Sequence, residues 1–320
     1  MMVNALTIDV EDYFHVYAFS NAIHQDQWDS FVPRVEKNTF RVLDIIDACK
    51  GPSGIDLRHT ATFFILAWVA ERFPGLVKEI VARGHEVACH GYSHQCIFNQ
   101  TRREFAEDVR KAKGILEDIT GKPVTGYRAP TYSIKKETLW AVEILVSLGF
   151  RYDSSIFPIR HDAYGIPDAP RFPFFIQCNG GSVTFQRLEG NGNGKNRNNR
   201  TKGLLEFPMT TTRIFGGNIP VAGGGYFRLF PYGLTKTLLR RVNERDRKAF
   251  IFYIHPWEID ADLPRIDGGD FVSNFRTYLN LEKTESRLKK LLSTFRFSSV
   301  SQLIKDEFSP SGASAEPIVE

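Results

Sequence analysis

Ionisable and aromatic side chains follow five of the strands that the sequence predicts, each at the point where the strand ends. They are Asp9, Glu11 and Asp12 after 3–8, His90 and His94 after 85–88, Arg128 and Tyr132 after 124–127, Asp153 after 150–152, and His255, Trp257 and Glu258 after 249–254. In a (β/α) barrel, reactive groups gather where the strands end. The coincidence predicts an active site assembled from these residues.

His90 and His94 have a spacing that two metal ligands could use. Four residues apart, both imidazoles lie on one face if residues 91–94 form a helical turn. With a carboxylate from segment 9–12 they would make a three-ligand set with open positions, which suits Zn²⁺ or another divalent first-row ion. The spacing alone is weak evidence, because chance produces it in roughly one such chain in five.

The segment TIDVED supplies three carboxylates, for which we expect different roles. One would bind the metal, and a second would stay free to take a proton from water. Asp9 and Glu11 share one face of the strand, whereas Asp12 reaches that side only if the backbone bulges. The plainer interpretation is that these acids cap the next element or are solvated.

Arg128, His255 and Trp257 are predicted to support such a centre. A buried Arg needs a carboxylate partner, and beside a general base it would keep that carboxylate ionised and oriented. His255 is a candidate general acid, or else a hydrogen-bonded core residue. Trp257 would offer an apolar wall to a methyl group, with core packing as the alternative. The glycines at 223–225 form no phosphate loop, but they would let a backbone approach a ligand closely.

Strand-like and helix-like segments alternate along the chain. Strands are predicted at 3–8, 60–66, 85–88, 124–127, 150–153, 249–254 and 295–300, and helices at 39–49, 74–83, 101–119, 139–148 and 285–292. Thr101 and Glu104 form a capping box, and Gly121 ends that helix. Alternation of this kind indicates an α/β fold. The length fits one (β/α) barrel domain over residues 1–308, with a doubly wound sheet as the alternative.

The charge balance argues against a nucleic-acid binder. The 320 residues carry a net charge of +4, and the polar segment 190–203 holds four basic residues and no acidic one. Removing these four from the 41 basic residues leaves 37, equal to the 37 acidic residues. The excess is therefore local to an insertion that we expect to be flexible. The small, polar tail at 309–320 is expected to be disordered.

The cysteines and the hydropathy of the sequence indicate where in the cell the protein is expected. None of the four cysteines forms C-x-x-C, which excludes a zinc knuckle and a thioredoxin motif. The first residues show neither a basic nor a long apolar signal segment, and the longest apolar run, 61–70, is about half of a membrane span. We therefore expect a cytoplasmic protein without an integral membrane segment.

The order of the motifs resembles a known family. TIDVED, HGYSH, RAPTYS, YDSSIFP and FYIHPWE, in this order between about residues 3 and 260, resemble the five motifs of NodB-type polysaccharide deacetylases, carbohydrate esterase family 4. The stretches YGIPDAPRFP, GGGYFRLFPY and HPWEID resemble the branch associated with bacterial exopolysaccharide clusters. The joint order is specific, although each motif alone is not.

The resemblance implies a distorted (β/α) barrel of about seven strands, with a C-terminal extension over about 260–308, and a metal-dependent N-deacetylase acting on an N-acetylated glycan. It implies Asp9 as catalytic base, Arg128 as its tether, His255 as general acid, and His90 and His94 as ligands of a metal, with Zn²⁺ expected. A backbone N–H near 131–132 would hold the oxyanion. Tyr132, Asp153 and Trp257 are expected to contact substrate, with Leu303 as a further wall of the acetyl pocket.

The sequence departs from the family's usual motifs at three places, and these departures leave alternatives open for the metal ligands and the function. Asp9-Val10-Glu11-Asp12 replaces two adjacent aspartates, so the third ligand is Glu11 or Asp12. Gly91 stands where Ser or Thr is usual, which resembles the subgroup with allantoinase-like and peptidoglycan-deacetylase-like members, some of them metal-independent. Thr131 stands before Tyr132, where an aromatic residue usually follows Pro directly. The alternatives are an amidohydrolase on a small cyclic amide and a catalytically silent glycan-binding protein.

Overall fold

The structure is a computed structural model, and it describes residues 2–52, 58–161, 164–179, 182–188, 203–266 and 271–308. The predicted insertion, except Gly203, and the predicted tail at 309–320 lie outside these residues. In the described ranges, no helix is both long and apolar enough to cross a membrane.

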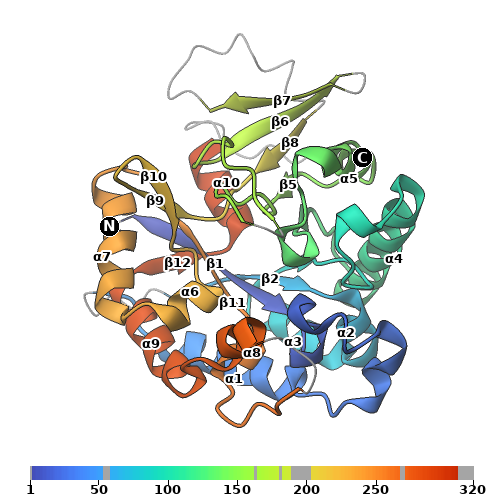
Figure 1. Cartoon of the computed structure of the whole chain (residues 1–320), viewed down its shortest axis with the longest axis horizontal. Helices are drawn as coiled ribbons and strands as arrows, with labels where there is room; N and C mark the ends of the chain where they lie inside the picture. Colours follow the sequence, from blue (N-terminus) through green and yellow to red (C-terminus); the bar gives the residue numbers. More distant parts are fainter. Residues whose placement is uncertain are drawn as a thin grey trace.

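The centre of the fold is a parallel sheet built around β1 (Val3–Val10), as Figure 1 shows. β1 pairs with β11 (Ile251–Ile254) on one side and with β2 (Thr62–Ile65) on the other. The parallel order continues through β3 (Glu86–Cys89), β4 (Gly126–Tyr127), β5 (Tyr152–Asp153) and β8 (Gly203–Glu206). β1 is buried from Asn4 onward, as expected for a parallel strand that is covered on both faces. The predicted α/β fold with a parallel sheet is confirmed.

The hydrogen-bonded order of the described strands runs from β11 to β7 and does not close into a ring. After β8 the sheet continues antiparallel through β6 (Phe174–Asn179) and β7 (Ser182–Arg187), which extend to the top of Figure 1. β9 (Thr211–Ile214) and β10 (Gly217–Pro220) form a separate hairpin. None of these four strands was predicted. The parallel strands from β11 to β8 are consistent with the expected distorted barrel of about seven strands.

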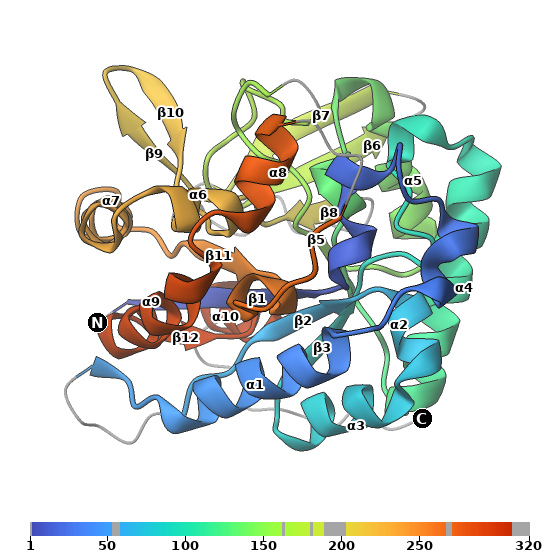
Figure 2. The ribbon, with the colours of Figure 1, turned by 60° about the horizontal axis from the view of Figure 1, so that its bottom comes forward.

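Helices connect and cover the strands, and α1, α3 and α4 lie next to one another along one side of the molecule (Figure 2). The helices are α1 (Val35–Ala48), α2 (Ala67–Arg72), α3 (Pro74–Ala82), α4 (Arg102–Thr120), α5 (Trp140–Ser147), α6 (Gly224–Leu229), α7 (Tyr232–Glu244), α8 (Phe271–Tyr278), α9 (Leu281–Thr294) and α10 (Val300–Phe308). The predicted capping box of Thr101 and Glu104 is present at α4, and Gly121 ends that helix in the left-handed conformation.

The C-terminal part of the chain packs against the amino ends of the central strands. β12 (Arg296–Ser298) pairs in parallel with the start of β1. The backbone N–H of Val300 donates to Thr62, the first residue of β2, at 2.8 Å. Leu303 on α10 is buried in the same interior cluster as Ala5 of β1. Because Asp9 and His90 lie at the other end of these strands, the expectation that Leu303 borders the acetyl pocket was wrong.

Candidate functional site

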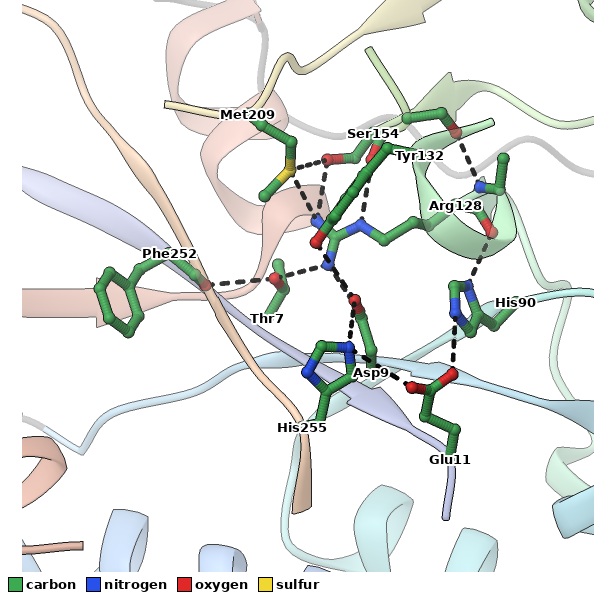
Figure 3. Close-up of polar contacts among 12 residues, drawn as sticks. Thr7, Asp9, Glu11, His90, Arg128, Tyr132, Ser154, Met209, Phe252 and His255 are labelled. Atoms are coloured by element: carbon green, nitrogen blue, oxygen red, sulfur yellow. Dashed lines mark hydrogen bonds and ion pairs between the residues drawn. The ribbon is translucent and has the colours of Figure 1, made fainter. Parts of the chain in front are cut away.

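Four strand ends bring polar side chains to one place (Figure 3). Asp9 lies on β1, Glu11 directly follows it, His90 follows β3, Arg128 follows β4, and His255 follows β11. All but His255 are nearly inaccessible to solvent, and the His255 side chain is 17% exposed. The parallel order of these strands therefore assembles, at one edge, residues that are up to 246 positions apart in the chain.

Glu11, His90 and His94 form a candidate metal centre. The Nε2 atom of His94 lies 2.5 Å from Oε2 of Glu11, and that of His90 lies 3.8 Å from the same oxygen. One ligand atom from each residue falls within 4.8 Å of the others. Two imidazoles and one carboxylate are the donor set that catalytic zinc sites use.

Two observations show that these residues fit a divalent cation. The Oε2 atom of Glu11 is buried and receives no hydrogen bond of acceptable geometry among the described groups. The Nδ1 atom of His90 lies 2.8 Å from the carbonyl oxygen of Arg128, which as acceptor requires the proton on Nδ1. The Nε2 lone pair of His90 then faces Glu11, and this backbone contact fixes the tautomer that a ligand needs.

The histidines next to Glu11 also control its ionisation. Burial raises the pKa of the Glu11 carboxyl, but His94, His255 and His90 outweigh burial and hold that pKa well below its usual range. Glu11 is therefore ionised at neutral pH, as a ligand must be.

The loop that carries His94 is not the helical turn that the spacing suggested. Residues 91–94 form bends, with φ of 76° at Gly91 and 50° at His94. Asp108 on α4 holds the loop by accepting hydrogen bonds from the backbone N–H groups of Tyr92 and Ser93 at 2.9 and 3.0 Å. A carboxylate on a neighbouring helix, rather than helical periodicity, brings the two imidazoles together.

Asp12, the alternative third ligand, is occupied elsewhere. Its Oδ2 accepts from the backbone N–H groups of Arg34 and Val35 at 2.6 and 2.9 Å, and its Oδ1 accepts from Tyr13 at 2.9 Å. Burial raises the pKa of Asp12 to about 6, against the lowering effect of these hydrogen bonds. Asp12 therefore caps the following turn and the start of α1, and the geometry favours Glu11 as the ligand.

Arg128 and Asp9 form a fully buried ion pair. The Nη1 atom of Arg128 donates to Oδ1 of Asp9 at 2.6 Å and to Thr7 at 2.8 Å. Its other donors reach the backbone oxygen and the hydroxyl of Ser154, at 3.0 and 2.9 Å. The guanidinium also lies 4.1 Å from the centre of the Phe64 ring. These contacts fix the Asp9 carboxylate and leave Oδ2 directed toward His255, whose Nε2 lies 3.8 Å away.

Tyr132 reaches the centre through its side chain. Its hydroxyl lies 3.5 Å from Oδ2 of Asp9, and its ring packs edge-on against Tyr253. Thr131 and Tyr132 are both left-handed, with φ of 57° and 54°. Such strain is retained where the surroundings enforce it, and it is frequent at active sites. The Tyr132 N–H donates to the carbonyl oxygen of Ala129 at 3.1 Å and is not a free oxyanion donor, so an oxyanion donor near residues 131–132 stays a prediction.

His255 lies between the carboxylates and an aromatic wall. Its Nε2 faces Oε1 of Glu11 at 3.5 Å, and the Trp257 ring stacks on it with centroids 5.2 Å apart. Burial lowers the pKa of His255, but Glu258, Glu11 and Asp9 together raise it to about 9. The imidazole is therefore charged at neutral pH and holds a proton that it can give away.

Asp153 does not reach the centre. It is fully buried, and it receives a hydrogen bond from the Ser155 hydroxyl at 2.5 Å. Directly opposite on β8 lies Glu206, which is also fully buried and accepts from the Ile156 N–H at 2.9 Å. The expected substrate contact through Asp153 therefore does not fit the structure. Sequence reasoning missed Glu206, although LLEFP resembles a strand with one acid in an apolar run.

The Asp153–Glu206 pair predicts a pH-dependent stability. Burial raises the pKa of Asp153 to about 6 and that of Glu206 well above its usual range. Carboxyls with raised pKa bind more protons in the folded state, so stability falls as pH rises from about 4 through 6 and beyond. We expect Glu206→Gln to flatten this loss by up to about 1.4 kcal/mol per pH unit in urea unfolding.

A control separates this effect from the loss of any carboxylate. Glu143→Gln removes a partly exposed acid of α5 that pairs with Arg102 at 2.8 Å, and it should leave the slope unchanged. If the free energy of unfolding changes with pH equally in the wild type and in Glu206→Gln between pH 5 and 9, the buried pair does not titrate with raised pKa values.

Two of the glycines at 223–225 lie close to another part of the chain. A Cβ atom on Gly223 would overlap the backbone oxygen of Tyr253, and one on Gly224 would overlap the Tyr253 ring. Gly223 forms a parallel bridge with Tyr253, and the Tyr253 N–H donates to Ala222 at 2.7 Å. Gly223 and Gly224 thus pack against β11, the strand that directly precedes His255, and the expected approach to a ligand stays a prediction.

Two family models match the chain. Residues 55–152 match the family described as "Polysaccharide deacetylase", and residues 189–305 match a "Domain of unknown function (DUF3473)". The first region contains His90, His94 and Arg128. The second contains His255 and Trp257. Asp9 and Glu11 precede both.

Curated relatives match over part of their length. A peptidoglycan deacetylase of Helicobacter pylori is 38% identical over 96 residues, which are 30% of this chain and 32% of that protein. The peptidoglycan deacetylase-like protein FGM2 of Gibberella zeae is 33% identical over 123 residues, 38% of this chain and 33% of that protein. The chain thus spans about a third of the length of these relatives.

One solved structure is similar over almost the whole chain. It is a Mycobacterium smegmatis protein assigned as a polysaccharide deacetylase, with a TM-score of 0.53 and 15% identity. The alignment covers 99% of this chain and 96% of that one. At this identity the likeness concerns the fold.

Proposed function

We propose that this chain, which carries a polysaccharide deacetylase domain, removes N-acetyl groups from the amino sugars of a glycan. The observation that supports this function is one buried cluster: the Glu11–His90–His94 ligand set beside the Asp9–Arg128 pair and His255. Amide hydrolysis needs a proton acceptor for water and a proton donor for the leaving amine. Asp9 would supply the first and His255 the second, and the Nε2 atom of His255 lies 3.8 Å from Oδ2 of Asp9 and 3.5 Å from Oε1 of Glu11.

We propose Zn²⁺ as the resident ion, held by Glu11, His90 and His94. A bound divalent cation of this kind lowers the pKa of water and polarises a carbonyl oxygen. Such an ion requires neutral imidazoles and an ionised carboxylate as ligands.

The chain's own residues move the protons. Asp9 takes a proton from the attacking water through Oδ2, because Oδ1 is held by Arg128 at 2.6 Å. His255, charged before the reaction, gives the proton on Nε2 to the departing amine. Acetate and a free amino sugar are the products. The stacked Trp257 ring backs His255 and forms an apolar surface beside the acetyl group.

The proposed substrate can be narrowed from N-acetylated glycans in general. Because the late motifs resemble the branch associated with exopolysaccharide clusters, we propose a polysaccharide or its lipid-linked precursor as substrate. We also propose that residues 1–308 act as one unit, since His255 from the later region completes the site of the earlier one. The Helicobacter pylori relative is a peptidoglycan deacetylase, and peptidoglycan is also an N-acetylated glycan.

The function is tested by comparing two amides. The protein is incubated with N-acetylglucosamine oligomers and, separately, with a small cyclic amide such as allantoin. We expect acetate from the oligomers and no ring opening. Ring opening without acetate would instead favour the amidohydrolase alternative, and tight oligomer binding without any turnover would favour a silent glycan-binding protein.

A further inference from the structure

Glu258 and Arg228 form a buried charged pair immediately behind His255, and no role in the reaction has been given to either. Their side chains are 1% and 3% exposed. The Nε and Nη2 atoms of Arg228 lie 3.3 and 3.2 Å from Oε1 of Glu258. A buried pair of this kind costs desolvation energy and is retained where it fixes a geometry.

Glu258 contacts His255 on the side away from the metal centre. Its Oε1 lies 3.6 Å from Nδ1 of His255, and its Oε2 accepts from the His255 backbone N–H at 3.3 Å. Nδ1 is buried and makes no hydrogen bond among the described groups, and the Glu258 carboxylate at 3.6 Å is the charged group that faces it. The opposite nitrogen, Nε2, faces Asp9 and Glu11 (Figure 3). The imidazole thus has one nitrogen toward Glu258 and one toward the reacting groups.

Arg228 is fixed by contacts of its guanidinium and of its backbone carbonyl group. Its Nη1 donates to the carbonyl oxygens of Arg276 and Thr277 at the end of α8, at 2.7 and 2.6 Å. Its own carbonyl oxygen accepts from Asn280 and Arg287, each at 2.9 Å. The guanidinium also lies 5.3 Å from the centre of the Trp257 ring. Arg228 therefore ties α6, α8 and α9 to the carboxylate that faces His255.

We propose that Glu258, anchored by Arg228, is the positioning residue that orients His255 for proton donation. In the reacting state that we infer, the carboxylate accepts a hydrogen bond from the Nδ1–H group, so that the Nε2–H group points to the leaving amine. This inference rests on the proposed function of His255. It gives the region that matches a domain of unknown function a part in the reaction, because Arg228, His255 and Glu258 all belong to residues 189–305.

The test uses two acetyl compounds that differ in their need for a proton donor. Hydrolysis of an N-acetylglucosamine oligomer requires protonation of the amine, whereas 4-nitrophenyl acetate releases a leaving group that needs none. We expect Glu258→Gln to lower kcat for the oligomer about a hundredfold with KM unchanged. Hydrolysis of the ester should fall less than about threefold. Arg228→Lys, which keeps the charge but not the forked contact, should show a smaller loss of the same kind.

A control variant and the ratio of the two rates distinguish a positioning role of Glu258 from a structural one. Glu143→Gln, the same chemical change at the α5 surface, should alter neither rate. Equal losses on amide and ester would assign Glu258 a purely structural role and overturn the proposal, as would unchanged rates on both. If Glu258→Gln fails to fold, the amide-to-ester ratio of Arg228→Lys decides in the same way.

A second measurement separates this proposal from the proposed function. The ¹⁵N signals of the His255 ring, identified with His255→Gln, report which nitrogen carries hydrogen and what it contacts. We expect the Nδ1 signal to shift in Glu258→Gln even if no glycan is turned over. An unchanged Nδ1 signal would overturn the positioning role whatever the activity, while absence of acetate from every glycan would contradict only the function.

Discussion

Asp9→Asn is expected to lower kcat for glycan deacetylation about a thousandfold, because the variant lacks the group that takes the proton from water. The amide has the same shape and can still contact Arg128. However, the guanidinium then lacks its buried counter-charge, and the free energy of unfolding should fall by about 3 kcal/mol. The measurements are kcat from acetate release and urea unfolding monitored by fluorescence.

Metal content serves as the control for Asp9→Asn. Because the proposed ligand set is Glu11, His90 and His94, the variant should still bind about one metal ion per chain. Full activity of Asp9→Asn would remove Asp9 as the base. Loss of the metal along with activity would show instead that Asp9 is a ligand.

His94→Ala has the second large effect that we expect. Removing one of three ligands should weaken Zn²⁺ binding at least a hundredfold, beyond the loss typical of residues that only orient a ligand. It also leaves the buried Glu11 carboxylate without its nearest partner, which lies 2.5 Å away. Zn²⁺ affinity is measured by competition with a chelating dye, and acetate release is measured in parallel.

His24→Ala is the matched control for His94→Ala, because His24 is exposed at the start of the short 3-10 helix Gln25–Ser30. It should bind Zn²⁺ as the wild type does. If His94→Ala binds Zn²⁺ as tightly as His24→Ala, the proposed metal centre is wrong, and the close contact between His94 and Glu11 is an ordinary ion pair.

The strands and helices that position the site could be predicted from the sequence where capping residues, apolar patterning and glycines all favour the observed element. β1 was predicted because a parallel strand, buried on both faces, appears as an apolar run. α4 was predicted because its cap, its apolar face and its terminal glycine agree. β6, β7, β8, β9 and β10 were missed, since short strands carry little signal apart from the strands that they pair with.

The sequence predicted which residues form the site better than it predicted how their side chains are arranged. Asp9, Arg128 and His255 meet because parallel strands end together, which the order of elements already implies. The choice of Glu11 over Asp12 was not predictable, because it depends on Asp12 receiving hydrogen bonds from the backbone of residues 34 and 35. Likewise, Glu206 could be paired with Asp153 only once β8 was known to follow β5 in the sheet.

Region 189–305 belongs to the site as much as region 55–152 does. The earlier region supplies Arg128 and the two proposed histidine ligands, and the later one supplies His255 with the Trp257 ring stacked on it. β8, from the later region, is the direct neighbour of β5 from the earlier one. A fragment that ends near residue 152 would therefore lack the proton donor and part of the sheet.

Metal-assisted removal of acetyl groups makes activity depend on the bound ion, and this dependence can be measured directly. Acetate release from an N-acetylglucosamine oligomer is followed in the purified protein, after chelation, and after Zn²⁺ is restored, with metal content determined at each stage. We predict about one ion per chain, loss of acetate release on chelation, and its return with Zn²⁺. Undiminished acetate release from metal-free protein would contradict the account.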